Sequence, residues 1–118
     1  MKPNRRRQGD EGEDLACAFL EREGYAIVER NFRYERAEVD VIAKDGDELV
    51  FVEVKSRRSN AFGEPEDAVD EAKQEQIVNA AEGYLTEKDL DNAPVRFDVV
   101  AITYRDDSPV IEHIRDAF

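Results

Sequence analysis

Charged residues interrupt the apolar pattern of the stretch AEVDVIAKDGDELVFVEVKSRR, which covers residues 37–58. Apart from those in or next to the segment KDGD and those at the end of the stretch, they are Glu38, Asp40, Glu53 and Lys55. The residues on both sides of KDGD alternate as they do in two strands joined by a tight turn. Carboxylates that face each other on neighbouring strands repel unless a positive charge lies between them. A divalent cation would supply that charge, and hard oxygen ligands favour Mg²⁺ or Mn²⁺.

The expected faces of this hairpin place its charges at one end. If the turn has two residues, 46–47, Ile42 pairs with Phe51 and, further along, Asp40 with Glu53. A four-residue turn would shift the register by two and keep the same faces together. This face is then apolar next to the turn and charged at its far end, whereas a solvated face would be polar along its whole length. The gradient favours a metal site at the rim of a buried face. The opposite face is expected to hold Val39, Val41, Ala43, Val50, Val52 and Val54.

The chain of 118 residues has a formal net charge of −12, which taken alone argues against a nucleic-acid partner. The charge is uneven, however. Residues 64–91 are strongly acidic, whereas RNFRYER (30–36) and KSRR (55–58) are basic and lie beside the charged face of the hairpin. Basic side chains there suit phosphate contacts. The acidic composition fits a protein from a high-salt cytoplasm and an ordinary acidic surface equally well.

Length and composition predict one domain over residues 1–118. No apolar run approaches the ~20 residues of a membrane span, and the basic, then acidic N-terminus lacks the apolar region of a secretory signal. Cys17 is the only cysteine, so no intramolecular disulfide can form. These features predict a cytoplasmic protein with no membrane partner.

The expected elements follow the order α-β-β-β-α-β-β. Apolar residues at helical spacing predict a helix over 10–24 and a second, amphipathic helix over 66–85. A loop with Gly63 and Pro65 separates the hairpin from the second helix. A meander followed by a helical crossover implies an α/β fold, a mixed sheet with helices packed on it. The strands are expected over 25–32, 38–43, 48–55, 95–104 and 109–114.

The spacing of the charges also resembles a known signature. Asp40, twelve further residues and then Glu-Val-Lys resemble the D…ExK core of the restriction-endonuclease-like superfamily. GDEGEDLACAFLEREGYAIVERNFR, FVEVKSR, RFDVV and the terminal AF together resemble the YraN-like family of predicted endonucleases, itself similar to archaeal Holliday junction resolvases. The resemblance runs from Gly9 to the end and implies a restriction-endonuclease-like αβββαβ core. Ala37 departs from it, because the family usually has glycine there.

The resemblance implies a role for each charged residue of the hairpin. Asp40 and Glu53 would hold Mg²⁺ or Mn²⁺, with the backbone carbonyl of Val54 as a third oxygen ligand. Lys55 would orient or help deprotonate the attacking water and offset charge on the scissile phosphate. The alternative for Lys55 is a cross-strand ion pair with Glu38, and the two roles are compatible.

Glu13 matches the acidic residue that the resolvase branch of the superfamily places near the metal or its water. It lies one turn before Ala16 and Cys17 on the expected first helix. An ordinary first-turn glutamate, favoured by the helix dipole, is the alternative, and Glu11 is the competing choice.

The remaining residues of interest divide into phosphate-binding and structural candidates. Each basic candidate has an ordinary surface role as its alternative, and for Lys73 the alternative is an ion pair with a nearby glutamate. Cys17 is expected in the core, and His113 is assigned no chemistry. The nucleic-acid-binding candidates are Arg33, Arg36, Arg57, Arg58 and Lys73, and the structural ones are Gly9, Gly12, Arg96 and Asp98.

Together these features predict a metal-dependent nuclease that hydrolyses DNA phosphodiester bonds, with branched or junction DNA as one option. Two alternatives stay open. One is a nucleic-acid-binding module that does not cut, and the other is a small interaction protein whose acidic helix binds a basic partner. The sequence also leaves open the shape of the substrate, DNA against RNA, and whether the chain forms a homodimer.

Overall fold

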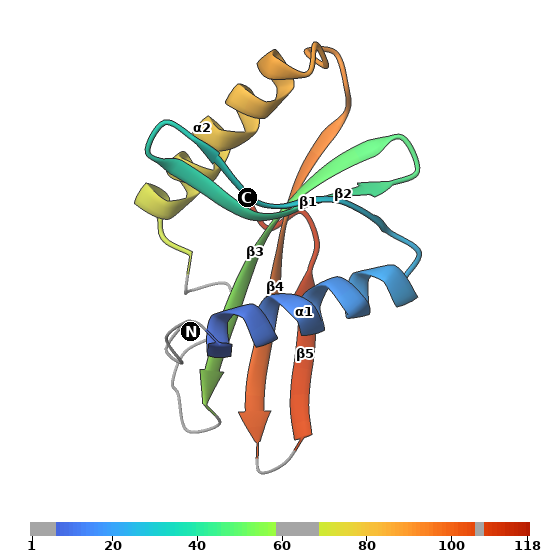
Figure 1. Cartoon of the computed structure of the whole chain (residues 1–118), viewed down its shortest axis with the longest axis vertical. Coiled ribbons are helices and arrows are strands. Elements are labelled where there is room, and N and C mark those ends of the chain that lie inside the picture. Colours follow the sequence, from blue (N-terminus) through green and yellow to red (C-terminus); the bar gives the residue numbers. More distant parts are fainter. Residues whose placement is uncertain (1–6, 59–68, 106–107) are drawn as a thin grey trace.

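The computed structural model describes residues 7–58, 69–105 and 108–118, apart from the side chains of residues 7–10 and 58. Its elements follow the predicted order of helix, three strands, helix and two strands (Figure 1). The loop expected around Gly63 and Pro65 lies outside the described residues. The elements are α1 (Arg7–Arg22), β1 (Ala26–Tyr34), β2 (Ala37–Asp45), β3 (Glu48–Arg58), α2 (Glu71–Glu87), β4 (Val95–Arg105) and β5 (Ser108–Ile114).

The strands form one five-stranded sheet in the order β1-β2-β3-β4-β5. Neighbouring strands are antiparallel, except that β3 and β4 run parallel. Parallel neighbours need a long crossover connection, and α2 lies in that connection between β3 and β4. The predicted α/β fold, a mixed sheet with helices packed on it, is confirmed.

The turn of the central hairpin has two residues, as predicted. β2 ends at Asp45 and β3 begins at Glu48, and these two residues face each other. Gly46 has a φ of 63°, a left-handed conformation that glycine adopts without steric cost and that two-residue hairpin turns require. The turn places Ile42 opposite Phe51, which confirms the predicted register near the turn.

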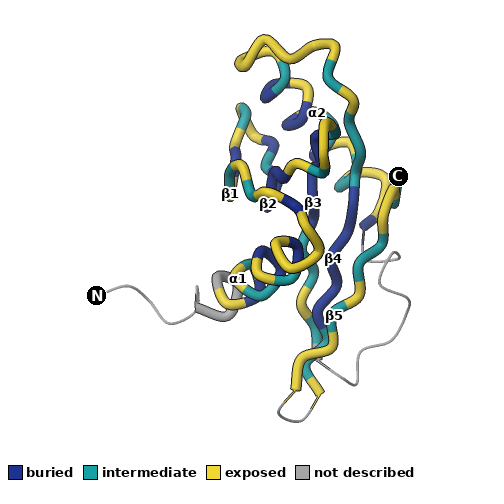
Figure 2. Tube along the Cα trace, turned by 90° about the vertical axis from the view of Figure 1, so that its right-hand side faces the viewer, coloured by how far each residue is buried: buried dark blue, intermediate teal, exposed yellow. Residues whose placement is uncertain are grey.

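Two apolar clusters lie on opposite faces of the sheet, one beneath each helix. Alternate residues of β3 divide between them, so that Val50 and Val52 pack with α1 whereas Leu49 and Phe51 pack with α2. Figure 2 shows that the middle of β3 and β4 is buried, as expected for strands covered on both faces. Cys17 belongs to the α1 cluster, which confirms its predicted place in the core.

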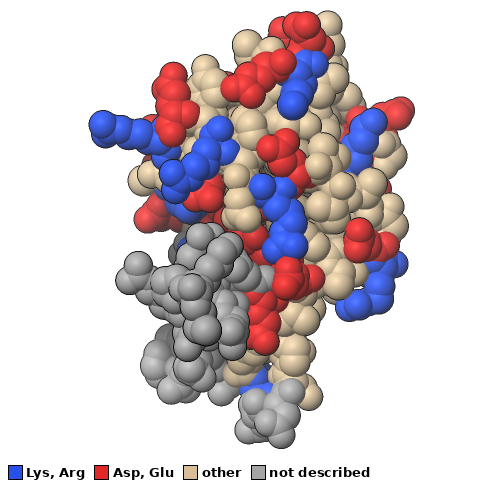
Figure 3. Space-filling view, viewed as in Figure 1, with Lys and Arg blue, Asp and Glu red and all other residues tan. Residues whose placement is uncertain are grey.

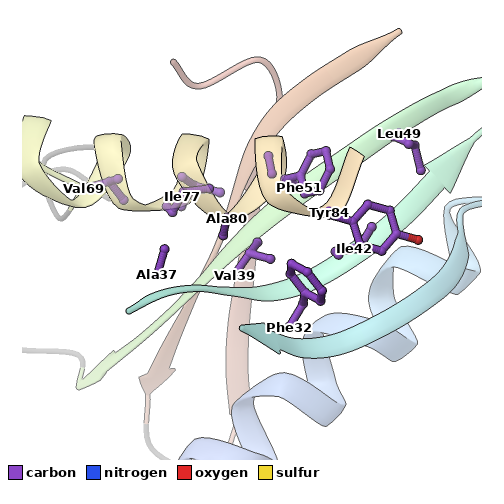
Figure 4. Packing of buried hydrophobic residues seen from close by; sticks show 12 residues of the cluster. Phe32, Ala37, Val39, Ile42, Leu49, Phe51, Val69, Ile77, Ala80 and Tyr84 are labelled. Atoms are coloured by element: carbon purple, nitrogen blue, oxygen red, sulfur yellow. The ribbon is translucent and has the colours of Figure 1, made fainter. Parts of the chain in front are cut away.

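In the two-stranded ribbon of β1 and β2, the side chains exchange faces of the sheet at Asn31 and Asp40. Val41 packs beneath α1, but Val39, which a regular strand would place on the same side, packs beneath α2. Phe32 of β1 packs beneath α2 as well, beside Val39 (Figure 4). The prediction that Val39 and Val41 share one face is therefore wrong.

The backbone of Asn31 explains this change of face. Arg30 faces Val41 and Phe32 faces Val39, which leaves Asn31 level with Asp40. Asn31 has a φ of 55°, in the left-handed region that asparagine tolerates better than most L-residues. A left-handed residue interrupts the alternation of side chains, so Phe32 turns from α1 towards α2. The sequence-based assignment of faces assumed an unbroken extended backbone.

The helices begin at different residues from those predicted. α1 extends back to Arg7, and α2 begins at Glu71 rather than at residue 66. Asp70 sets the start of α2, because its backbone is extended and its side chain accepts a hydrogen bond of 2.9 Å from the backbone nitrogen of Lys73. Among the described residues, neither helix combines the length and apolar character needed to cross a membrane.

A buried charge network ties the C-terminal segment to β4. Asp98 is fully buried and accepts hydrogen bonds from Arg96 at 2.9 and 3.0 Å and from the backbone nitrogen of Asp116 at 3.0 Å. His113 lies 2.7 Å from the same carboxylate. Burial alone would raise the pKa of Asp98, but the bonds from His113, Arg96 and Asp116 lower it to about 2. The network fits the structural role expected for Arg96 and Asp98, and it includes His113, to which the sequence assigns no chemistry.

Candidate metal centre

Asp40 lies where β2 and β3 separate. The ladder between these strands ends with Val41 opposite Val52. One residue further, the Asp40 Oδ2 atom accepts a hydrogen bond of 2.9 Å from the backbone nitrogen of Val54. The side chain of Asp40 thus takes the place of a backbone acceptor from the neighbouring strand. The ladder ends one pair before the predicted pair of Asp40 with Glu53, but the two side chains interact at this rim.

Glu53 is almost completely buried, with 3 % of its surface exposed. Its Oε2 atom lies 3.8 Å from Lys55 Nζ and 3.6 Å from Lys73 Nζ. Its Oε1 atom is also buried but has no hydrogen-bond partner in the described part of the chain. A buried carboxylate oxygen without a partner is costly. Glu53 therefore has an unsatisfied acceptor that a bound cation would satisfy.

Burial is the main reason that the pKa of Glu53 is raised, and the negative charge of Asp40 raises it further. The positive charges of Lys73 and Lys55 oppose this effect but do not cancel it, so that the pKa is about 7. The carboxylates of Asp40 and Glu53 are therefore close enough to interact strongly. Near neutral pH, a proton and a cation would compete for Glu53.

Two lysines approach Glu53 from different elements. Lys55 lies on β3, two residues after Glu53, and Lys73 lies on the first turn of α2. Glu38 is the alternative partner of Lys55, but its Oε1 atom lies 3.8 Å from Arg33 Nη2, across β1 and β2. The alternative ion pair of Lys55 with Glu38 is therefore wrong. The glutamate that pairs with Lys73 is Glu53 itself, which places Lys73 at the centre.

Glu13 approaches the centre from α1. Its pKa is raised, first by burial, and the charge of Asp40 contributes, while hydrogen bonds from Asn31 and Arg30 act in the opposite direction. The charge of Asp40 therefore acts on Glu13. α1 begins at Arg7, so Glu13 lies beyond the first turn, where the helix dipole has little effect.

Glu11, the competing choice on α1, has a different environment. It is exposed, and its charge acts on Tyr104 of β4. The structure thus brings Glu13 to Asp40 and leaves Glu11 outside the centre.

One turn of the same helix also runs very close to β3, because a Cβ on Gly12 would lie 2.5 Å from Ser56 Oγ. That contact fits the structural role expected for Gly12.

The donor set has the chemistry that a hard divalent cation requires. Asp40 and Glu53 provide two carboxylates, and the backbone carbonyl of Val54, the next residue, remains the predicted third oxygen ligand. No group of three His, Cys, Asp or Glu side chains within residues 7–58, 69–105 and 108–118 is arranged to hold a metal ion. A cation bound here would therefore need backbone oxygen or water to complete its coordination.

Comparison with known proteins identifies the family. A sequence model described as "Uncharacterised protein family UPF0102" matches residues 12–102. The chain belongs to the UPF0102 family. A UPF0102 protein of Geotalea uraniireducens is 55% identical over 111 residues, covering 93% of this chain and 87% of the relative. One of Geobacter sulfurreducens is 53% identical over the same length, with the same coverage of both chains. One of Clostridium perfringens is 46% identical over 120 residues, covering 100% of this chain and 98% of the relative. The YraN-like membership is thereby confirmed.

The predicted phosphate-binding arginines of this UPF0102 protein come from different parts of the sheet. Arg33 is exposed and pairs with Glu38. Arg57 is half-buried on β3, opposite Thr103 of β4. Arg58 ends β3, and its side chain lies outside the described part. Their role in binding stays a prediction.

A cavity of about 490 Å³ lies between the β1–β2 turn and α2. Its lining includes Tyr34, Arg36, Gln76 and Gly83. The ring of Tyr34 rests against the backbone of Gly83 so closely that a Cβ on this helical glycine would overlap it. Asp40 and Glu53 do not line this cavity. Arg36 therefore lines a cavity that the two carboxylates of the candidate metal centre do not line.

Sequence reasoning missed two residues of the UPF0102 site, Arg30 and Asn31, which contact Glu13 at 3.3 and 3.0 Å. Asparagine is uncommon in strands and tolerates the left-handed conformation. Its position inside the strand-like segment YAIVERNF was therefore the available signal. Nothing in the sequence showed that its side chain would reach α1.

Proposed function

We propose that this UPF0102 protein is a metal-dependent nuclease that hydrolyses phosphodiester bonds of DNA. The observation that carries the proposal is the buried carboxylate of Glu53, whose Oε1 atom has no partner among the described residues while Asp40 lies close by. A carboxylate that served stability alone would be expected to have both oxygens satisfied. A raised pKa together with an unsatisfied oxygen is typical of a group that binds a ligand.

The proposed cofactor is Mg²⁺ or Mn²⁺, held by Asp40, Glu53 and the backbone carbonyl of Val54. When bound, the ion would lower the pKa of a water molecule and polarise the scissile phosphate. Asp40 is suited to this role, because its Oδ2 atom is fixed by the backbone nitrogen of Val54 and its charge acts on Glu53. Fixing one oxygen in advance reduces the entropy lost when a ligand binds.

The two lysines would act on the phosphate and on the attacking water. Both Nζ atoms lie within 4 Å of the same oxygen of Glu53, and ammonium groups bind phosphate oxygens as compact charges. We assign to Lys55 the orientation of the water and to Lys73 the neutralisation of phosphate charge. With these assignments, β3 and α2 each contribute one positively charged side chain to the site at which the phosphate would react.

The order of elements and the spacing from Asp40 to Glu53 and Lys55 support a restriction-endonuclease-like assignment for this chain. The αβββαβ order is present, followed by one further strand. Arg33, Arg36, Arg57 and Arg58 are the proposed contacts with the DNA backbone. Branched DNA, such as a junction, is the favoured substrate because of the resemblance to resolvases.

A cleavage screen tests the proposal. Single-stranded, flap and four-way junction DNA would be incubated with the protein and Mg²⁺ or Mn²⁺, at low and at molar KCl. Glu53→Gln is the control, because it keeps the shape of the side chain and removes its charge. We expect cleavage of at least one substrate by the wild type, none with EDTA, and none by Glu53→Gln.

Other results of the screen would favour the alternatives. Binding of DNA without cleavage in any metal would indicate a nucleic-acid-binding module. An absence of both binding and cleavage at every salt concentration would contradict the nuclease proposal and leave the interaction protein.

A further inference from the structure

Asn31 combines an unusual backbone with an unusual contact. It lies inside β1 with a φ of 55°, although L-residues other than glycine rarely adopt this conformation. Its side-chain amide leaves the strand and donates a hydrogen bond of 3.0 Å to Glu13 Oε1 on α1. Costly backbone conformations of this kind persist where the surrounding structure requires them, and they cluster at functional sites.

Two successive residues of β1 hold the same oxygen atom. Arg30 donates to Glu13 Oε1 at 3.3 Å, and its other terminal nitrogen lies 2.9 Å from Asp14. In a regular strand, successive side chains point to opposite faces, so only one of Arg30 and Asn31 would face α1. The left-handed backbone of Asn31 brings the second donor to the same side.

Within the described part of the chain, this contact leaves the second oxygen of Glu13 without a partner. The bonds formed by Glu13 with other described residues all involve Oε1. Its side chain is only 13 % exposed, and its partner Asn31 is level with Asp40 in the ribbon. Fixing Oε1 restricts the rotamers of Glu13 and leaves Oε2 to act, through water, on a group held at Asp40 and Glu53, because the three carboxylates, all among the described residues, are not arranged to hold an ion together.

We propose that Asn31 is a positioning residue whose amide, together with Arg30, holds Glu13 so that its second oxygen serves the centre at Asp40 and Glu53. This inference rests on the proposed function. It is distinct from the turning of Phe32 towards α2, which needs the left-handed backbone of Asn31 but not its amide.

Asn31→Gly separates these two roles, because glycine adopts the same backbone conformation and lacks the amide. We expect the metal-free variant to have an unchanged or higher Tm. We expect the Kd for Mn²⁺ to rise and kcat for DNA cleavage to fall, each by about 10-fold, with KM for DNA unchanged. Asp89→Gly is the matched control, because Asp89 is another residue with positive φ (58°) and lies after α2, outside the centre. It should leave Kd and kcat unchanged.

A double mutant tests whether Asn31 acts through Glu13. If it does, Asn31→Gly combined with Glu13→Gln should bind Mn²⁺ no more weakly than Glu13→Gln alone. Asn31→Asp, which keeps the tolerance for a left-handed backbone but replaces the donor with a carboxylate, should weaken Mn²⁺ binding more than Asn31→Gly.

Three results would overturn the inference. Wild-type Kd and kcat in Asn31→Gly would show that the amide positions nothing. Losses that multiply in the double mutant would show that Asn31 acts independently of Glu13. If the wild type neither binds Mn²⁺ nor cleaves DNA, the proposed function fails and the inference fails with it, whereas the first two results leave the proposed function intact.

Discussion

Glu53 has a raised pKa because burial and the charge of Asp40 both disfavour its ionised form, and Lys55 and Lys73 only partly compensate. Such an arrangement is unfavourable for stability in the absence of a ligand. A divalent cation in place of the bound proton would offset the repulsion between the two carboxylates, because each would then face a positive charge.

The stability of the metal-free protein should therefore depend on pH through Glu53. Its pKa is raised from 4.5 in an unperturbed side chain to about 7 in the folded protein. Between these two values the native state holds a proton that the unfolded chain has lost, so the free energy of unfolding decreases as pH rises. We expect a decrease on the order of 1–3 kcal/mol over this range, levelling off above pH 7.

Urea denaturation from pH 4 to 8, with EDTA, measures this dependence. Glu53→Gln should lose most of the decrease and keep only the part due to Glu13, whose pKa is also raised. An identical slope in Glu53→Gln and the wild type would mean that Glu53 does not titrate in this range.

Lys55→Ala separates chemistry from metal binding. Lysine is not a ligand for Mg²⁺ or Mn²⁺, so the variant should bind Mn²⁺ within a few-fold of the wild type. Cleavage should fall at least 10²-fold, the usual size of a general acid–base or charge contribution. Calorimetry and a single-turnover cleavage assay give the two values, with Lys44→Ala as a control on the exposed far side of the hairpin. Full activity of Lys55→Ala would remove this residue from the mechanism.

The order of elements, the two-residue turn and the register next to it were all predictable, because each depends on local signals. The apolar period marked the helices and strands, and Gly46 marked the turn. The face of each residue in β1 and β2 was not predictable beyond Asn31 and Asp40. There the left-handed backbone of Asn31 changes the face to which the next side chains of the strand point. The residue types alone do not specify that backbone angle.

The candidate site shows the same division. The spacing from Asp40 to Glu53 and Lys55 is a property of the sequence, and the hairpin brings these residues to one rim. The contact of Arg30 and Asn31 with Glu13 depends on where α1 crosses the ribbon. That placement follows from the packing of Ala16, Cys17 and Leu20 on the sheet, which the sequence does not specify residue by residue.

At the scale of α2, the contact between Tyr34 and Gly83 should decide how tightly the ribbon packs on the helix. Gly83→Ala inserts a methyl group where the ring lies, and overpacking of this kind typically costs about 1–3 kcal/mol. In a Tyr34→Ala background the same change should instead stabilise the protein by up to about 1 kcal/mol, because alanine is the better helix former.

Chemical denaturation of the four proteins in this cycle gives the coupling. A destabilisation by Gly83→Ala of equal size in both backgrounds would show that the ring of Tyr34 is not the obstacle.

Across the whole molecule, positive and negative side chains are interleaved on the face seen in Figure 3, and the net charge is −12. A polyanion therefore meets overall repulsion at long range, and attraction must come from a few local contacts. Such binding is sensitive both to salt and to the removal of single arginines.

Replacing Arg57 and Arg58 together with alanine should weaken DNA binding and reduce the slope of log K against log salt by about one to two. Fluorescence anisotropy at several KCl concentrations, without metal so that no cleavage occurs, measures this slope. Arg22→Ala, at the far end of α1, is the control and should leave the slope unchanged. A slope that does not change in the double variant would mean that DNA does not pass along the end of β3.

The hydrogen bond from the Val54 backbone to Asp40 gives the molecule a built-in spectroscopic reporter. An amide proton that is bound to a carboxylate responds to any change in that carboxylate's charge, and its exchange with solvent slows or accelerates with the strength of the bond. Binding of a cation to the other oxygen of Asp40 should therefore shift the ¹⁵N–¹H resonance of Val54 without a change of fold. Titration of the labelled protein with Mg²⁺ would then follow occupancy in a single peak, and that peak should stay still in Asp40→Asn.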